Sequence, residues 1–165
     1  MGKIAMIMGS DSDWPVLESG YDLLKEFNIE VEVLVASAHR TPEVVHDFVL
    51  KAEEKEIEVI IAAAGAAAHL PGVIAAYTTL PVIGVPISGS ALKGMDALLS
   101  IVQMPSGIPV GTMAIDGGKN AALYAISILA IKEKSIAEKL KEFRLSQAEQ
   151  IHKKNKYLQE KLGGF

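Results

Sequence analysis

The sequence contains no cysteine among its 165 residues. Disulfide bonds and thiolate metal ligands are therefore excluded, no structural zinc site is expected, and the composition is compatible with a reducing compartment. An excess of basic residues is also lacking, because 16 Lys and Arg residues accompany 20 Asp and Glu residues and the formal net charge is -4. A nucleic-acid-binding surface or an anionic-membrane surface needs a basic face, so neither partner is predicted.

Long hydrophobic runs are absent as well. The longest uncharged apolar stretch, Val59 to Ala68, is half of the roughly 20 residues that a membrane-spanning helix needs. The apolar segment from Ile4 to Met8 is too short for a signal peptide and leads directly into Asp11 and Asp13. We expect neither a membrane span nor a targeting segment, and the default prediction is a cytoplasmic protein.

What the sequence does contain is a regular alternation of apolar runs and amphipathic segments. With 50% hydrophobic and 22% charged residues, the chain fits one globular domain with a substantial core. Strands separated by helices predict a parallel sheet with right-handed crossovers, and hence an α/β, three-layer αβα sandwich that is flavodoxin- or Rossmann-like. The expected strands span 4–8, 31–36, 59–63, 82–85 and 110–115, and the expected helices span 15–27, 41–55, 71–77, 95–102 and 120–131.

The C-terminal part predicts a long charged helix over residues 136–162. Apolar side chains lie along one side of it, and we expect this side to pack on a neighbour: Ile136, Leu140, Phe143 and Ile151. No repeat or linker interrupts the chain. The prediction is therefore a single domain over 1–165, with a core of about 3–131 and this helical extension.

Three short loops follow the first three expected strands, at residues 9–13, 37–42 and 65–72. In an open parallel sheet, the loops that leave the carboxyl ends of neighbouring strands converge on one crevice, where ligands bind. The three loops are therefore expected to build one site.

The first loop is a candidate phosphate site. Gly9 permits a sharp turn, Ser10 and Ser12 offer hydroxyl donors, and the following helix presents free N–H groups. The alternative is that Ser12 or Asp13 merely caps that helix. The loop has neither the three glycines of a dinucleotide site nor a Gly-Lys-Ser/Thr sequence, which argues against a nicotinamide cofactor and ATP.

The second and third loops carry histidines. His39 is followed by Arg40, whose planar guanidinium suits a phosphate, although an ion pair with Glu43 is the alternative. His69 follows the small residues of 62–68, which would let a planar ligand lie against the backbone. A structural His69 that bonds a carbonyl or orients a neighbour is the other interpretation.

The remaining histidines lie on expected helices. His46 and His152 are expected to be solvated or to pack on neighbouring helices. No two histidines have the close helical spacing of zinc ligands, so no metal site is predicted.

Together, four motifs resemble the PurE family of N5-carboxyaminoimidazole ribonucleotide mutases of purine biosynthesis: residues 8–14 (MGSDSDW), 37–42 (SAHRTP), 67–72 (AAHLPG) and 100–105 (SIVQMP). The resemblance extends from Ile4 to about Ile131. Arg40 and the intact His-Leu-Pro-Gly sequence are similar to the class I mutases, whereas class II carboxylases usually carry lysine after the first histidine and lack the third motif.

The resemblance implies roles for individual residues. His39 would be the general acid and base, while Ser10, Asp13 and Arg40 would bind the phosphoribosyl group, with Arg40 on the phosphate and Asp13 on the ribose hydroxyls. His69 is a secondary, pocket-forming candidate. The candidate set is completed by Ser12, Ser37 and Gly65.

It also implies a small-molecule ribonucleotide as substrate, no cofactor and no metal, and a homo-octamer. The chain departs from the usual family pattern where Ala63 and Ala66 replace glycines. If Ala66 needs a positive φ, its Cβ costs about 1 kcal/mol or more.

Three other functions remain open at this point. The protein could carboxylate aminoimidazole ribonucleotide with free CO2, or it could be a non-catalytic module that binds phosphoribosyl nucleotides. A third possibility is a PurE-like carboxylase of another aromatic ring, as in nickel-cofactor assembly, which the lack of an extra N-terminal domain disfavours.

Overall fold

The computed structural model describes residues 2–163, and within them five strands form one parallel sheet in the order β2-β1-β3-β4-β5. The predicted parallel sheet is confirmed, and its order is that of a flavodoxin-like doubly wound fold. The strands are β1 (Lys3–Met8), β2 (Glu30–Val35), β3 (Val59–Gly65), β4 (Val82–Ile87) and β5 (Gly111–Thr112).

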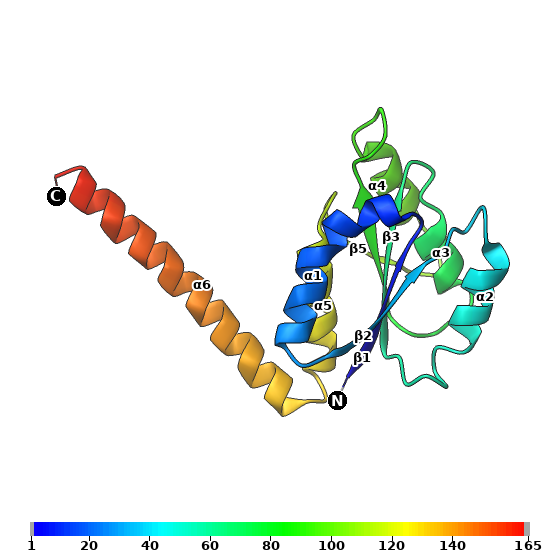
Figure 1. Ribbon diagram of the computed structural model, residues 1–165, viewed down its shortest axis with the longest axis horizontal. Helices are drawn as coiled ribbons and strands as arrows, with labels where there is room; N and C mark the ends of the chain where they lie inside the picture. Colours follow the sequence, from blue (N-terminus) through cyan, green and yellow to red (C-terminus); the bar gives the residue numbers. More distant parts are fainter. Residues whose placement is uncertain (1, 164–165) are drawn as a thin grey trace.

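Helices cover both faces of this sheet. α1 and α5 lie on one face, while α2, α3 and α4 lie on the other, so the predicted three-layer sandwich is confirmed (Figure 1). The bounds are η1, a short 3-10 helix (Asp11–Asp13), α1 (Trp14–Glu26), α2 (Pro42–Leu50), α3 (Leu70–Ala75), α4 (Met95–Val102), α5 (Gly118–Leu129) and α6 (Lys134–Lys161).

Two apolar cores, one on each face, bury the central strands. Successive side chains of a strand point to opposite faces. Accordingly, Ile4 and Met6 of β1 join the core under α1 and α5, whereas Ala5 and Ile7 join the other core. Because both faces are covered, the central strands read as continuous apolar runs, which is why they were recognisable in the sequence.

Glycines allow α1 and α5 to pack unusually closely. A Cβ on Gly118 would lie 2.1 Å from the carbonyl oxygen of Val16, and one on Gly20 would lie 2.6 Å from the carbonyl oxygen of Gly118. No larger residue fits at this crossing. The close packing fixes α1, whose first turn follows directly after the loop that leaves β1.

Two predicted elements are shorter than expected. The strand expected at 110–115 is reduced to Gly111–Thr112, because β5 is an edge strand that pairs only with β4. The helix expected at 41–55 ends at Leu50, and the chain turns back into β3 through Glu56 in the left-handed region, at φ 60°. The Ile57 N–H bonds the Ala52 carbonyl across this turn, an arrangement that ends helices.

The long C-terminal helix is present, but only its first part packs on the sandwich. Ile136 is buried, and the centroid of the Phe143 ring lies 6.1 Å from that of the Phe27 ring, which belongs to the loop after α1. Farther along, α6 extends away from the body of the molecule, and Ile151 is 64% exposed (Figure 1). The expected packing is therefore observed for the first turns of α6 and not at Ile151.

Among residues 2–163, no helix has both the length and the apolar character needed to cross a bilayer.

Candidate active site

The three loops that were expected to converge do meet at one cavity of about 360 Å³. It lies at the carboxyl ends of β1, β2 and β3, beside the point where the strand order reverses, which is where doubly wound sheets bind ligands. Its lining consists of Gly9, Ser10, Asp13, Ser37, Ala38, His39, Arg40, Ala64, Gly65, Ala67, Ala68, His69 and Leu70.

Ser10 organises the first loop. Its hydroxyl oxygen accepts hydrogen bonds from the Ser12 N–H at 3.3 Å and from the Ser12 hydroxyl at 2.9 Å, and so it caps η1. Asp13 stands at the start of α1 but makes no capping bond there, so the alternative that Ser12 or Asp13 serves as the cap is wrong. Ser12 itself lies outside the cavity lining, and its hydroxyl bonds Ser10 at 2.9 Å and Asp13 at 3.5 Å.

Asp13 is a buried carboxyl group in the wall of the cavity, with 7% of its surface exposed. Burial raises the pKa of Asp13 above its ordinary value, while a backbone hydrogen bond at Ser10 and the Ser12 hydroxyl oppose that shift. The Arg40 guanidinium also opposes it. An acidic group held in this way can accept hydrogen bonds from the hydroxyls of a ligand that replaces water.

The second loop is fixed by its own side chains. The Ser37 hydroxyl accepts the N–H of His39 at 3.3 Å and the N–H of Arg40 at 3.2 Å. The Ser37 N–H donates to the Thr41 hydroxyl at 2.9 Å, and the Thr41 N–H donates to the Ser37 carbonyl at 2.9 Å. Ser37 therefore lines the cavity and also holds the backbone that carries His39 and Arg40.

Arg40 links the second loop to the first. One of its guanidinium nitrogens, Nη2, donates to the Gly9 carbonyl at 2.9 Å. No ion pair between Arg40 and Glu43 occurs in the part of the chain that the structure describes, so that alternative is not supported. The guanidinium has five N–H donors, and among residues 2–163 one side-chain bond, to Gly9, anchors it beside the cavity.

His39 and His69 contact each other directly. Nε2 of His39 lies 2.8 Å from Nδ1 of His69, and the two rings meet edge to face. The contact joins the loops that follow β2 and β3, which are the two neighbours of β1 in the sheet. Sequence reasoning placed both imidazoles at one site but missed this hydrogen bond.

Small residues form the third loop and one wall of the cavity. Ala66 adopts φ 50°, so the positive φ considered for this position is confirmed. The turn is tight, because the Ala68 N–H bonds the Ala66 carbonyl at 2.9 Å. Gly65 and the neighbouring alanines have little or no side chain, so a flat ligand can lie close to this wall of the cavity.

Some lining residues were not identified from the sequence. Ala38 and Leu70 carry no chemical signal of their own, and only their position beside the two histidines would have pointed to them. Among residues 2–163, no group of three or more His, Cys, Asp or Glu side chains is arranged to hold a metal ion.

The sequence of the chain is similar to those of known proteins. Residues 3–150 match the family described as AIR carboxylase. A Pyrococcus abyssi protein named N5-carboxyaminoimidazole ribonucleotide mutase is 60% identical over 144 residues, which cover 87% of this chain and 83% of the relative. The phosphoribosylaminoimidazole carboxylase of Saccharomyces cerevisiae is 49% identical over 148 residues, which cover 90% of this chain and 26% of the yeast protein.

Structural comparison leads to the same group. The crystal structure of Treponema denticola PurE superposes with a TM-score of 0.87 at 30% identity and covers 96% of this chain and 99% of that one. Both the sequence match and the fold extend over most of the chain. The chain therefore belongs to the AIR carboxylase family.

Proposed function

We propose that the protein is an isomerase, an N5-carboxyaminoimidazole ribonucleotide mutase of purine biosynthesis. The observation that carries this proposal is the arrangement of an imidazole, a guanidinium and a buried carboxyl group around one cavity: His39, Arg40 and Asp13. The Pyrococcus abyssi relative bears the name of this activity. These groups supply what the reaction needs, namely a proton carrier and donors and acceptors for a sugar phosphate.

The phosphoribosyl group is assigned to the first two loops. Arg40 binds the phosphate, because a guanidinium offers several parallel N–H donors to phosphate oxygens. Ser10 and the carboxyl group of Asp13 hold the ribose hydroxyls. Gly65 and the following alanines then lie against the imidazole ring of the substrate, and Ser12 and Ser37 keep the two loops in shape.

His39 moves the proton. As an imidazolium it protonates the exocyclic nitrogen of the carbamate, and the C–N bond breaks to release CO2 and aminoimidazole ribonucleotide. The electron-rich ring carbon four then attacks CO2 and forms a C–C bond. The neutral imidazole of His39 removes the proton from that carbon, so His39 ends the cycle protonated, as it began.

Between these two steps, CO2 must remain next to the ring. Ala64, Ala67 and Ala68 supply short apolar side chains to the cavity wall, and Ala64 and Ala68 are buried. A wall of short apolar side chains favours recapture over hydration or escape.

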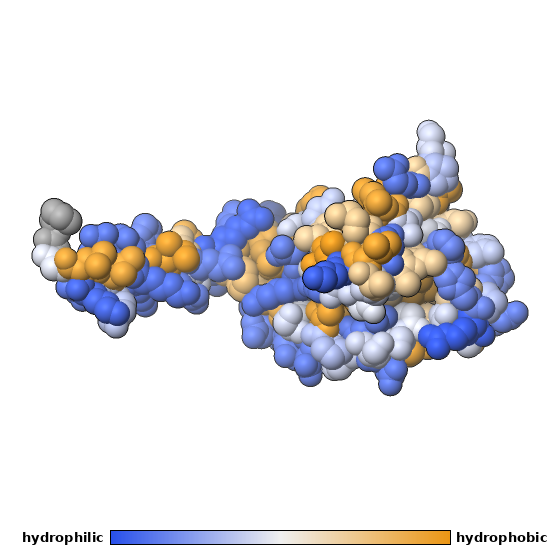
Figure 2. All heavy atoms as spheres, turned by 90° about the horizontal axis from the view of Figure 1, so that it is seen from above, coloured by the Kyte–Doolittle hydropathy of each residue, from blue (hydrophilic) through white to orange (hydrophobic). Residues whose placement is uncertain are grey.

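We also propose that the chain is a single domain that forms a homo-octamer in the cytoplasm. Exposed apolar surface supports self-association, since Val33 and Val35 are exposed on β2 beside Trp14 and Tyr21. Hydrophobic side chains also lie along the outer half of α6, as Figure 2 shows. Surface of this kind on a small protein is typical of a subunit interface.

A second candidate is a carboxylase that joins free CO2 to aminoimidazole ribonucleotide. The yeast relative is named as a carboxylase, and the same cavity would accommodate that reaction. The two candidates differ only in the source of the carboxyl group. Assays of the purified protein with each substrate, in the absence of ATP, separate them.

The test is a turnover assay with the carbamate substrate. We expect conversion to the carbon-linked carboxylate at a rate that greatly exceeds carboxylation of aminoimidazole ribonucleotide at physiological bicarbonate. A faster reaction with free CO2 would support the second candidate. Binding of the ribonucleotide without any turnover would contradict both and indicate a non-catalytic module.

A further inference from the structure

The hydrogen bond between His39 and His69 constrains both rings. At 2.8 Å between Nε2 of His39 and Nδ1 of His69, one nitrogen must donate a proton and the other must accept it. The two side chains cannot rotate independently while this bond exists. The ring of His39 is therefore positioned by a residue 30 positions away.

His69 is itself held firmly on the backbone. Its N–H donates to the Ala67 carbonyl at 2.6 Å, and its carbonyl accepts the Val73 N–H at 2.9 Å, in the first turn of α3. His39 is held through its N–H on Ser37. Two anchored backbones thus bring the two imidazoles together, which is the arrangement expected of a residue that orients another.

We propose, on the basis of the proposed function, that His69 is a positioning residue that accepts the Nε2 proton of His39 at its own Nδ1 and leaves Nδ1 of His39 to exchange protons with the substrate. In this assignment the hydrogen bond from Nε2–H of His39 to Nδ1 of His69 persists through the cycle. Imidazolium His39 donates its Nδ1 proton to the carbamate nitrogen, and neutral His39 then accepts the ring proton at the same Nδ1. His69 keeps its own proton on Nε2 throughout.

The opposite assignment would not support the cycle. If His69 donated from Nδ1, then Nε2 of neutral His39 would be occupied as an acceptor and Nδ1 would carry the proton. The nitrogen facing away from His69 could not then remove a proton from ring carbon four. The direction of this hydrogen bond thus decides which nitrogen of His39 is chemically competent.

The direction of the bond can be read in the free protein. In ¹⁵N-histidine-labelled protein at alkaline pH, where imidazoles are neutral, the two nitrogens of each ring have distinct shifts that identify the protonated one. We expect His39 and His69 both to carry the proton on Nε2. A proton on Nδ1 of His39 would overturn the proposal without bearing on the proposed function, which the turnover assay tests separately.

Kinetics provide the second measurement. His69→Leu removes the acceptor but keeps a side chain of similar size, whereas His69→Asn restores an acceptor near the position of Nδ1. We expect His69→Leu to lower kcat about 10- to 100-fold with little change in KM, and His69→Asn to recover most of the loss. His46→Asn, at a half-exposed histidine on α2 beside Tyr77, is the matched control and should leave kcat and KM unchanged.

A different kinetic pattern would contradict the positioning role. If His69 only lined the pocket, both variants would raise KM and leave kcat unaltered, and asparagine would be no better than leucine. The orientation of the His39 ring in a crystal structure of the His69→Leu protein adds a check that does not depend on turnover. A His39 ring that keeps the same orientation in that protein would also overturn the proposal.

Discussion

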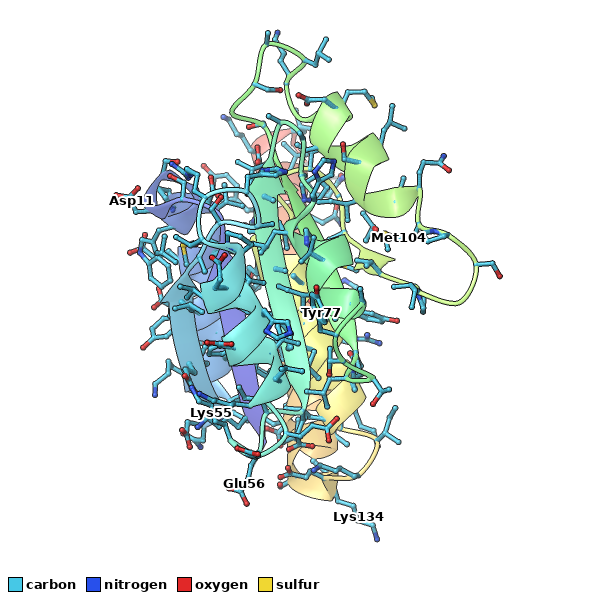
Figure 3. The ribbon with its side chains drawn as sticks, turned by 90° about the vertical axis from the view of Figure 1, so that its right-hand side faces the viewer. Asp11, Lys55, Glu56, Tyr77, Met104 and Lys134 are labelled. Carbon is cyan, nitrogen blue, oxygen red and sulfur yellow. The ribbon has the colours of Figure 1, made fainter. Side chains whose placement is uncertain are left out.

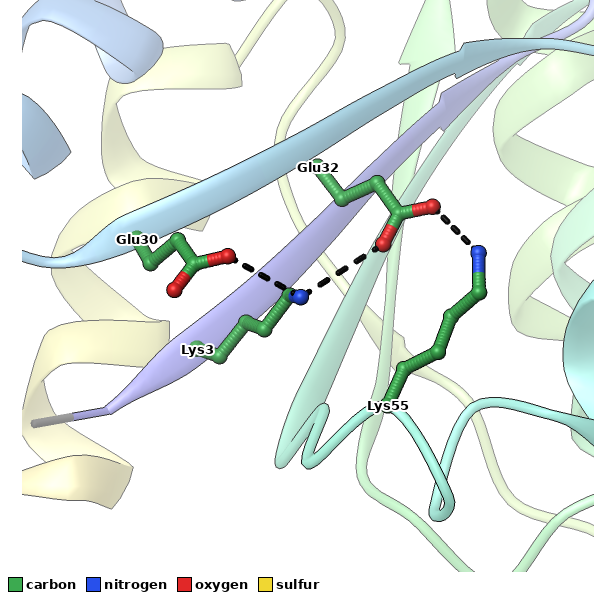
Figure 4. Close-up of polar contacts among 4 residues, drawn as sticks. All are labelled: Lys3, Glu30, Glu32 and Lys55. Carbon is green, nitrogen blue, oxygen red and sulfur yellow. Dashed lines mark hydrogen bonds and ion pairs between the residues drawn. The ribbon is translucent and has the colours of Figure 1, made fainter.

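At the amino end of the sheet, charged side chains bind one another, whereas at the carboxyl end they are held mainly by backbone atoms and hydroxyls. Lys3 lies between Glu30 at 2.9 Å and Glu32 at 3.7 Å, and Lys55 also pairs with Glu32 (Figure 4). At the other end, Arg40 bonds a carbonyl and Asp13 is buried. Figure 3 shows how far apart the ends lie, with Asp11 at one and Lys55 at the other.

The two ends differ in how far their charged groups remain available to a ligand. Opposite charges that pair in solvent contribute little beyond local order. A charged group that is held by the backbone keeps its remaining hydrogen-bonding capacity for a ligand. A buried acid such as Asp13 lowers the stability of the fold at neutral pH, because burial disfavours its charged form. We therefore expect substitutions at the carboxyl end to affect function strongly, and those at the amino end to have small effects.

Substitution of His39 is expected to reduce turnover more than any other change. His39→Asn keeps a polar side chain but cannot exchange a proton, so turnover should fall about 10²- to 10⁴-fold while the ribonucleotide still binds. Steady-state kinetics and calorimetric titration with the product measure the two quantities. Turnover within a factor of two of the unmodified protein would remove His39 from the mechanism.

Arg40 is expected to act mainly on binding. Arg40→Met removes the phosphate donors and the bond to the Gly9 carbonyl, so KM should rise about 10- to 100-fold, the range for hydrogen bonds to a charged group. Arg144→Met is the matched control, because Arg144 is the other arginine in the chain and lies exposed on α6. Equal effects of the two substitutions would contradict phosphate binding by Arg40.

Asp13→Asn should weaken substrate binding and yet stabilise the fold at neutral pH. Because the folded-state pKa of Asp13 is raised, the native protein binds more protons than the unfolded chain, and stability falls as pH rises from the ordinary value of 3.8 through the folded pKa. The asparagine variant should be more stable at pH 7, and this advantage should disappear at a pH below 3.8. Urea unfolding of the variant and the unmodified protein at both pH values measures this difference in stability. A variant that is less stable than the unmodified protein at pH 7 would disprove burial as the main cause of the raised pKa of Asp13.

A smaller effect is expected at Ala66. Its φ of 50° is strained for a residue with a Cβ, so Ala66→Gly should increase the free energy of unfolding by about 0.5–1 kcal/mol after the greater entropy of glycine in the unfolded chain is subtracted. Ala68→Gly, at a buried residue without a positive φ, should instead reduce stability. The same sign for both substitutions in thermal unfolding would argue against strain at Ala66.

The smallest effect is expected at the amino end. The pKa of Lys3 lies above its ordinary value of 10.5, chiefly through its hydrogen bond with Glu30, so this pair stabilises the fold below that pH and loses its effect as pH rises through the pKa of Lys3. Glu30→Gln should lower the melting temperature slightly at pH 7, less so in about 1 M salt, and leave turnover unchanged. A marked loss of activity would mean that the two ends are coupled.

Much of the fold could be predicted from the sequence, because β1, β3 and β4 are continuous apolar runs and α4 has the bounds expected for it. A fifth strand was also predicted, but its length was not, since an edge strand is defined by its pairing: after Thr112, the Met113 N–H bonds the Gly84 carbonyl and the chain then leaves the sheet. Nor did the helix pattern indicate that α2 stops at Leu50, because there the backbone changes to bonds that span three residues, from the Lys51 N–H to the Phe48 carbonyl and from the Ala52 N–H to the Val49 carbonyl.

For the candidate site, too, single residues could be predicted from the sequence, whereas the contacts between loops could not. The loops that carry His39, Arg40 and Asp13 were predicted because each follows an apolar strand, which is a property of local sequence, and the family resemblance implied the roles of the three residues. The bonds from Arg40 to Gly9 and from His39 to His69 were not, since they depend on β1 lying between β2 and β3 and on side-chain rotamers. Patterns along a chain do not carry this information.

The most direct test of the proton-transfer mechanism is a crystal structure of the His39→Asn protein soaked with N5-carboxyaminoimidazole ribonucleotide. We predict the ring in the cavity at the carboxyl end, with its exocyclic nitrogen and ring carbon four next to residue 39 and its phosphate on Arg40. A ribonucleotide bound instead in the cavity of about 550 Å³ around Tyr77, Pro81 and Gly107, or with its ring far from residue 39, would contradict the mechanism.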